Sequence, residues 1–195
     1  MQIRQRWFAV LLLVAALLTS ATSRSSAEGG ALTLGSGLAF SILIPDNGDN
    51  LNVFSAPEGS GFLGVSTSPG LRLGHVSATR GFEFGVGVGA QYASSSGESA
   101  HMLTFGLDAQ KHFVGKSSWN LFLGGELGLG TADFFGDDVT QPYFGAMVGG
   151  RNIISDDNGS MKIALHLRHH LDDEDAGADS YNEVAFAMHF DLWIP

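Results

Sequence analysis

The sequence predicts an all-β protein, an eight-stranded antiparallel up-and-down transmembrane β-barrel, and two observations lead to this prediction. Apolar residues recur at every second position through separate segments of the chain, which is the side-chain period of a β-strand. Glycine is abundant, with 27 residues, and it recurs inside those segments, where it disfavours a helix. Beyond residue 27, no stretch approaches the roughly 18 continuous apolar residues of a membrane-spanning helix. We therefore expect strands to cross the membrane.

Residues 1–27 have the features of a secretory signal peptide. Arg4 and Arg6 form a basic start, the segment 8–18 is continuously apolar, and small residues follow it. The apolar segment is too short for a membrane anchor, which needs about 20 residues. We therefore expect the signal peptide to be removed on export and the barrel to occupy residues 28–195.

The remainder of the chain is one domain by length and is strongly acidic. Without the three N-terminal arginines, 7 of the 10 basic residues remain beside all 20 acidic ones, so the formal net charge is 7 − 20 = −13. An acidic surface repels phosphates, so we expect no nucleic-acid partner. The chain has no cysteine, which excludes disulfides and thiol chemistry, and no residue pattern indicates a cofactor.

The first four strands are expected at 32–44, 61–77, 81–93 and 101–113, each with one apolar face. Pro69-Gly70 predicts a bulge or break within the second of them. The apolar face in chain order consists of Leu34, Leu38, Phe40, Ile42, Ile44, Leu63, Val65, Leu71, Leu73, Phe82, Phe84, Val86, Val88, Tyr92, Leu103, Phe105, Leu107, Ala109 and Phe113.

The last four strands are expected at 118–131, 142–154, 160–171 and 181–194. The final strand shows the alternation most clearly, because an apolar residue stands at every even position from Val184 to Ile194. The apolar face of the three others consists of Trp119, Leu121, Leu123, Leu127, Leu129, Phe144, Ala146, Val148, Met161, Ile163, Leu165 and Leu167. Each of the eight strands is long enough to cross a bilayer at a tilt, which takes about 9–11 residues.

Short and longer connections alternate along the chain. The connections after the second, fourth and sixth strands are short, and the sixth contains Asn158-Gly159, a strong hairpin signal. The connections after the odd-numbered strands are mostly longer and acidic, such as 45–60 and 172–180. Barrels of the bacterial outer membrane have short periplasmic turns and longer outer loops in this order, and an even strand number leaves no open edge in lipid.

With these features the chain resembles the small eight-stranded outer-membrane barrels of the OmpA transmembrane-domain and OmpX type. The resemblance covers nearly all of 30–195 and rests on the pattern of strands. Members of that group usually end on an aromatic residue, whereas this chain ends Trp193-Ile194-Pro195. A soluble, lipocalin-like barrel is the alternative, but it would carry more charge on its polar face.

The resemblance places the apolar faces toward lipid and the polar faces in the lumen. Adjacent strands then bring opposite charges together: we expect Arg72 across from Glu83, Arg168 near Glu183, and Lys162 near Asp191. Charges removed from water are stabilised by pairing and hydrogen bonding, so this face predicts a polar plug rather than a wide pore. The expected lumen network is Arg72, Glu83, Asp108, Glu126, Arg151, Lys162, Arg168, Glu183 and Asp191.

A second resemblance suggests an enzyme. The segment 120–133, followed by a strand that ends in His, is similar to the lipid A 3-O-deacylases of the PagL family. That resemblance implies a catalytic His and Ser at the end of the seventh strand, with an acid on the last. His169 is the lipid-facing histidine here, but Leu171 stands where the nucleophilic Ser is required. We therefore favour the expectation that the protein is not an enzyme.

The same hypothesis has a shifted version. His170 is then the base, Asp172 occupies the position of the nucleophile, and Glu183 is the nearest acid but faces inward. An inactive relative of the hydrolases, an active one, and a narrow porin-like channel for small solutes all remain alternatives.

The loop after the seventh strand is dense in acids. Asp172, Glu174 and Asp175 are weak candidates for a divalent cation, and a Ca²⁺-loop pattern is broken because Ala176 occupies one ligand position. We expect a monomer in the outer membrane of a Gram-negative envelope, in contact with lipids and lipopolysaccharide. Its expected role is structural or surface-interacting, through acidic outer loops.

Overall fold

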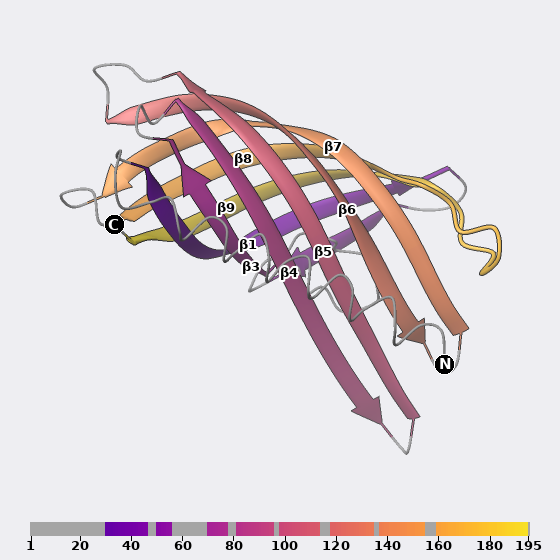
Figure 1. Ribbon diagram of the computed structural model, residues 1–195. Helices are drawn as coiled ribbons and strands as arrows, with labels where there is room; N and C mark the ends of the chain where they lie inside the picture. Colours follow the sequence, from indigo (N-terminus) through magenta and orange to yellow (C-terminus); the bar gives the residue numbers. More distant parts are fainter. Residues whose placement is uncertain are drawn as a thin grey trace.

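The computed structural model describes residues 30–46, 50–55, 70–77, 81–95, 98–113, 118–134, 137–154 and 159–194, and these are almost wholly β-strand (Figure 1). The strands are β1 (Ala31–Pro45), β2 (Leu51–Ser55), β3 (Leu71–Val76), β4 (Phe82–Ser95), β5 (Glu98–Phe113), β6 (Trp119–Phe134), β7 (Asp137–Ile154), β8 (Gly159–His170) and β9 (Tyr181–Ile194).

All these strands belong to one sheet that closes on itself. Their order is β2-β1-β3-β4-β5-β6-β7-β8-β9, with a further pairing of β1 and β9. Every pairing is antiparallel, and the closing pair runs from Leu32 opposite Ile194 to Pro45 opposite Tyr181. The predicted eight-stranded antiparallel barrel is confirmed, with β2 and β3 sharing one of the eight places in its wall.

β2 and β3 together fill one strand position of the wall because they lie end to end along β1. β3 pairs with residues 31–36 of β1, and β2 pairs with residues 39–43. The expectation that residues 45–60 form only a loop is therefore wrong at 51–55. Five residues are too few for alternation to stand out in a sequence.

The second predicted strand is described only in its last part. Of the range 61–77, the described part forms a strand only at 71–76, and Gly70 bends the chain just before it. Residues 61–69, including Leu63, Val65 and Pro69, lie outside the described residues.

Two hairpins are longer than predicted. β4 and β5 stay paired out to Ser95 opposite Glu98, and β6 and β7 out to Phe134 opposite Asp137. The expected loops at 94–100 and 132–141 are thus mostly strand, since ladder hydrogen bonds form along polar sequences as well as alternating ones. Figure 1 shows both hairpins extending past the neighbouring strands at one end of the barrel. We call this the loop end, and the opposite end, where β3 connects to β4 and β5 to β6, the turn end.

The two faces of the wall differ as the alternation predicts. On β9, Glu183, Ala185 and Asp191 are buried, whereas Phe186 and Leu192 are 49% and 66% exposed. The exposed large apolar side chains include Phe84, Leu121 and Phe144 on other strands. The wall is therefore apolar outside and polar or small inside.

A structured loop joins β8 to β9 at the loop end. Its tip is a tight turn between Asp173 and Ala178, in which Gly177 has a φ of 67°. Glycine adopts this left-handed conformation without the steric penalty of a side chain. The Asp173 carboxylate accepts from the Thr140 amide of β7 at 2.7 Å, and Ser180 Oγ donates to Asp46 Oδ2 at 2.6 Å, just beyond β1. The loop is thus tied to both neighbouring strand ends.

Helices long and apolar enough to cross a membrane are absent from the described part of the chain. The expected signal peptide at 1–27 lies outside it and stays a prediction.

Candidate functional site

The lumen holds the predicted polar residues, and all nine face it. Eight of them have relative exposures of 9% or less, and the side chain of Asp108 is 12% exposed. Five are carboxylates, three are arginines and one is a lysine. Their ion pairs fall into two clusters, one toward the turn end and one toward the loop end. The members are Arg72, Glu83, Asp108, Arg151, Lys162 and Asp191 in the first cluster, and Glu126, Arg168 and Glu183 in the second.

Glu83 is the centre of the turn-end cluster. Its Oε1 accepts from Arg72 Nη1 and from Lys162 Nζ, both at 2.5 Å. Its Oε2 accepts from Arg151 Nη1 at 3.2 Å, and His112 Nε2 lies at the same distance from that oxygen. Glu83 is fully buried, so positive charges from β3, β7 and β8, together with the His112 ring of β5, replace the water that would otherwise solvate the carboxylate.

Arg72 and Glu83 form an ion pair although they are not direct partners across the two strands. The two were predicted to lie directly across from each other, but Arg72 stands opposite Gly87 and Glu83 opposite Val76. The Arg72 side chain therefore leans along the wall, where its guanidinium lies close to Gly85. A Cβ atom at Gly85 would collide with that guanidinium and with Asp108. This close approach is a physical reason for glycine at position 85.

Asp108 holds the other side of the same guanidinium. Arg72 Nε donates to Asp108 Oδ2 at 2.8 Å and Arg72 Nη2 to Oδ1 at 2.7 Å, a two-point contact that fixes orientation. Gln110 Nε2 also donates to Asp108 Oδ1, at 2.8 Å. Lys162 completes the cluster through Asp191 Oδ2 at 3.0 Å.

Arg168 is the centre of the loop-end cluster. Its Nε and Nη2 donate to the two oxygens of Glu126 at 2.9 and 3.1 Å, and its Nη1 donates to Glu183 Oε1 at 3.2 Å. His166 Nδ1 lies 2.9 Å from Glu126 Oε1. The cluster therefore connects β6, β8 and β9 across the lumen.

Glu183 extends this cluster to the closing seam of the barrel. Ser41 Oγ of β1 donates to Glu183 Oε1 at 2.6 Å, and His170 Nε2 lies 3.0 Å from Oε2. The His170 ring stacks on Tyr181 with centroids 4.1 Å apart and an interplanar angle of 6°. This buried group brings a hydroxyl, an imidazole and a carboxylate together.

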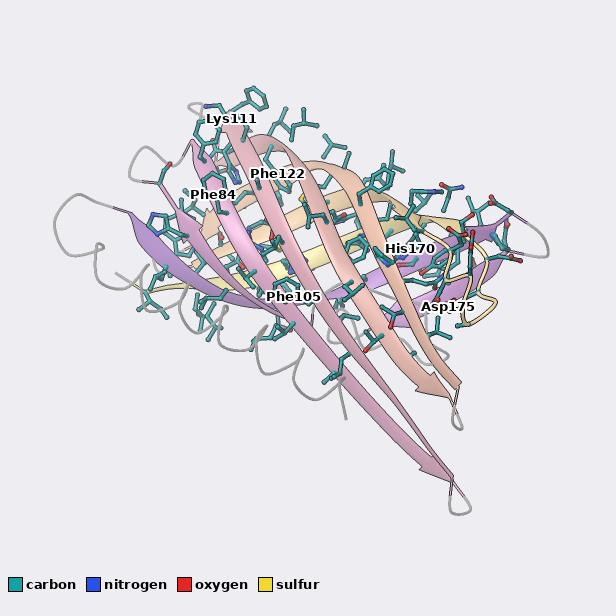
Figure 2. All side chains as sticks on the ribbon, turned by 45° about the vertical axis from the view of Figure 1, so that its right-hand side comes forward. Phe84, Phe105, Lys111, Phe122, His170 and Asp175 are labelled. Carbon is teal, nitrogen blue, oxygen red and sulfur yellow. The ribbon has the colours of Figure 1, made fainter. Side chains whose placement is uncertain are left out.

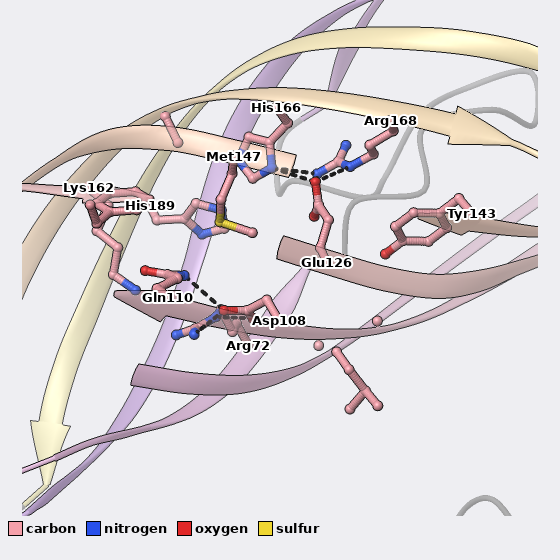
Figure 3. A pocket seen from close by; sticks show the side chains of 15 residues that line it. Arg72, Asp108, Gln110, Glu126, Tyr143, Met147, Lys162, His166, Arg168 and His189 are labelled. Atoms are coloured by element: carbon pink, nitrogen blue, oxygen red, sulfur yellow. Dashed lines mark hydrogen bonds and ion pairs between the residues drawn. The ribbon is translucent and has the colours of Figure 1, made fainter. Parts of the chain in front are cut away.

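A small cavity lies between the two clusters. It has a volume of about 40 Å³, enough for a few water molecules, and Asp108, Glu126, Met147 and His166 are among its lining residues. Figure 3 shows the Glu126 group and the Arg72–Asp108 group around it, each held by its own contacts. At this level, side chains of the described residues surround a space large enough for water molecules.

The residues that the hydrolase hypothesis requires do not form a catalytic group. His169 is partly exposed, its Nδ1 lies 3.1 Å from Asn182 Oδ1, and its ring is near Phe144, with centroids 5.5 Å apart. Leu171 is exposed and has no nucleophilic atom.

The shifted version of that hypothesis brings only two residues together. His170 and Glu183 are in contact inside the lumen, while Asp172 is exposed in the following loop. Ser41 donates to the carboxylate of Glu183, whereas a serine hydrolase needs its hydroxyl on the imidazole. The geometry therefore gives the PagL resemblance no support.

The acidic loop shows no built cation site. Asp172, Glu174 and Asp175 are exposed, and Asp173 uses its carboxylate to bind backbone amides. Within the described residues, no group of three or more His, Asp or Glu is placed to hold a metal ion.

Several members of the lumen network were not predicted as such. His112 lies beside Glu83, Ser41 binds Glu183, and Trp193 Nε1 donates to Ser160 Oγ at 3.1 Å. All four stand at inward positions of their strands, so the same alternation that placed the charged residues marks them too.

Comparison with solved structures places this architecture in a class. The chain is similar to Neisserial surface protein A (NspA), with a TM-score of 0.58 and 15% identity over 85% of this chain and 99% of that one. Two structures of Ail, the attachment invasion locus protein of Yersinia pestis, are also similar. One is in complex with the heparin analogue sucrose octasulfate. Their TM-scores are 0.49 and 0.47, both at 12% identity, covering 85% and 86% of this chain and 99% of theirs.

The fold is that of the small eight-stranded outer-membrane β-barrels, as the resemblance to the OmpA and OmpX type implied. No protein-family model matches the sequence, and no curated protein is similar enough to count as a match.

Proposed function

We propose that this protein is a small barrel of the bacterial outer membrane with a structural or surface-interacting role, exercised through its acidic loop end. The observation that carries the proposal is the outer face of the wall. Large apolar side chains there are open to the surroundings, with Leu121 67%, Leu192 66% and Phe84 58% exposed. A continuous apolar belt is unfavourable in water and favourable against lipid.

The interior supports the same proposal and argues against a wide pore. Charged side chains cross the lumen and pair, as Lys162 does with Glu83 and Arg168 with Glu126. Eight strands enclose an interior that side chains just fill. The barrel is thus proposed to act at its surface rather than by passing solutes.

The two ends of the barrel differ in charge. The loop between β8 and β9 carries Asp172, Asp173, Glu174, Asp175 and Asp179 without a basic residue. Lys111 is exposed near the turn end, where the connections contain Arg80 and Lys116 beside Asp156 and Asp157 in sequence, so basic and acidic residues balance there. Figure 2 shows Lys111 and Asp175 at opposite ends. This polarity supports an orientation with the acidic loops outside and the turns in the periplasm.

The proposal includes export by a signal peptide over residues 1–27 and a monomer surrounded by outer-membrane lipids and lipopolysaccharide. Divalent cations would bind loosely between the acidic loops and lipopolysaccharide phosphates. NspA is named a surface protein, which agrees with a surface role for a chain of the same fold.

Heat-modifiable migration in gels tests the barrel in its membrane. We expect the unheated, detergent-extracted protein to migrate differently from the boiled protein and to fractionate with outer membranes. Recovery in the soluble fraction without detergent would contradict the proposal. Protease added to intact cells should cut within 171–180 and spare the turn end; the reverse pattern would contradict the orientation.

A narrow channel is the second candidate, favoured by the water-sized cavity between the charged clusters. Recording in planar bilayers tests it. Conductance that changes when Lys162 is replaced by Gln would support the channel, whereas a silent bilayer containing folded barrels would support the surface role.

A further inference from the structure

A groove runs along the outer face of the wall across β1 and β3 to β7. Its volume is about 720 Å³, and its lining is predominantly apolar. Asp108 and Glu126 also border it, but their side chains bind Arg72 and Arg168 in the lumen, so they contribute backbone to its floor. The groove therefore opens toward the surroundings of the barrel and not into its interior.

Two rows of outward side chains form its sides. One row consists of His75, Phe84, Ala109 and Gly125, which are consecutive partners across β3, β4, β5 and β6. The other consists of Leu73, Val86, Leu107 and Leu127. The groove is open at Ala109 and Gly125, where large residues would otherwise continue the row. Each row spans four adjacent strands, which makes it about 14 Å long.

The groove is slanted with respect to the barrel. His75 is the penultimate residue of β3 and lies next to the turn end, whereas Gly125 is six positions into β6. Strand stagger thus leads the groove from the turn-end rim into the middle of the apolar belt. One end is polar and near the membrane surface, and the other is apolar and deep.

The rim end carries positive charge. Lys111 lies two positions beyond Ala109 on the same face of β5, about 7 Å nearer the turn end. Its Nζ stands 3.9 Å from the centre of the Phe82 ring, and the side chain is exposed. The acids of the barrel wall face inward at this level, where Glu83 and Asp108 are already paired. An anionic group at this rim would therefore meet a cation and the His75 imidazole.

We propose that the groove binds one phospholipid of the periplasmic leaflet, with an acyl chain between the two rows and the anionic headgroup at Lys111 and His75. This inference rests on the proposed membrane location and deepens it by naming a specific lipid. A phospholipid fits because its charged head and apolar tail match the two ends of the groove. Lipopolysaccharide occupies the opposite leaflet in the proposed orientation, at the loop end.

Native mass spectrometry of the refolded barrel tests the proposal, with phosphatidylglycerol added to the detergent as the probe. We expect one retained phosphatidylglycerol per barrel. Gly125→Leu should reduce retention about tenfold by filling the groove. A Cβ atom at Gly125 would meet only the Gly145 carbonyl oxygen at 3.7 Å, so the barrel itself has room for the change. Val148→Leu is the matched control, because Val148 is outward, 51% exposed and outside the groove lining.

The headgroup contact has its own measurement. Lys111→Gln should weaken phosphatidylglycerol retention about fivefold, since one cation near a membrane surface contributes about 1 kcal/mol. Phosphatidylcholine, which has no net charge, should be retained less by the wild type and be unaffected by this substitution. Equal retention of the two lipids by the wild type would overturn the headgroup assignment.

Each failure has a distinct signature. Equal retention by the Gly125→Leu and Val148→Leu barrels, both heat-modifiable in gels, would overturn the groove proposal and leave the membrane barrel standing. Ala109→Leu provides a second groove-filling variant if Gly125→Leu does not fold. A wild-type protein that is soluble without detergent would instead contradict the proposed function itself.

Discussion

At the scale of single residues, Glu83 shows how the interior is held together. Its two oxygens contact groups from β3, β5, β7 and β8, so one carboxylate connects distant parts of the wall. Removing one partner of a buried charge cluster is strongly destabilising, because the remaining charges have lost both water and their counter-charge.

Replacing Glu83 with Ala should lower the free energy of unfolding by about 3–5 kcal/mol. Urea titration of the refolded barrel in liposomes, followed by heat-modifiable migration, measures this. Asp175→Ala is the matched control, since it removes a carboxylate that is exposed in the loop, and a change within about 0.5 kcal/mol is expected. Equal effects of the two variants would mean that the Glu83 cluster contributes little to stability.

Two glycines on opposite faces of the wall offer a second residue-scale prediction. A Cβ atom at Gly149 would collide with the Ile163 carbonyl oxygen of the next strand, whereas one at Gly125 has room. Gly149→Ala should therefore destabilise the barrel by about 1–3 kcal/mol, while Gly125→Ala should be neutral or slightly stabilising. The same urea titration compares them, and similar losses for both would contradict the assignment of faces.

At the scale of the strand, the outward and inward faces of a strand have different surroundings. Phe186 lies near the middle of β9 and Ile194 at its turn-end terminus, and both are outward, at 49% and 48% exposed. Their environments differ in depth within the proposed bilayer, because the first lies in the belt and the second near its edge.

Substitution by arginine at these two positions should show how deep each one lies in the bilayer. Phe186→Arg should destabilise the barrel in liposomes by about 2–4 kcal/mol, and Ile194→Arg by about 0–1 kcal/mol. Unfolding of the purified variants in liposomes of defined composition provides the measurement. If Phe186→Arg improves solubility without detergent and leaves stability unchanged, the outer face contacts water instead of lipid.

The strands could be predicted from sequence wherever one face meets lipid. Phe82 to Val88 and Val184 to Ile194 alternate because an apolar belt and a polar lumen act on opposite sides of the same strand. The hairpin segments outside the predicted strands, such as the described residues 94–95 and 98–100, have mostly small and polar residues in sequence. Ladder hydrogen bonds join backbone groups whatever the side chains, so this pairing leaves no periodic signal in the sequence.

The sequence predicts which residues point into the lumen, but only some of the ion pairs that they form there. Alternation put Arg168 and Glu183 inward on neighbouring strands, and their side chains meet. The contacts of Glu83 with Lys162 and Arg151 cross the lumen between strands that are not neighbours. Such contacts depend on the width and stagger of the closed barrel, which a strand list does not contain.

At the scale of the whole molecule, closure depends on β1 and β9. Leu38 and Met188 are partners across this seam and both face outward. Directly paired residues of antiparallel strands have Cα atoms about 4.5–5.5 Å apart, within the range of a disulfide.

The variant Leu38→Cys/Met188→Cys should therefore form an intramolecular cross-link on oxidation, in a chain that has no other cysteine. Non-reducing gels of the boiled protein should show a faster band that disappears with reductant. Leu38→Cys/Leu192→Cys is the control, because Leu192 pairs with Leu34, four positions away along β1. Equal cross-linking of both variants would contradict the register.

The seam also sets the order in which the barrel assembles. From β4 to β9, each strand pairs with the one before it in the chain, so these contacts form between segments close in sequence. The β1–β9 ladder and the Ser41–Glu183 hydrogen bond join the two ends of the described chain, and loop-closure entropy opposes them most. Contacts between distant segments slow folding. We expect the seam to form last during insertion and to set the rate at which the finished barrel closes.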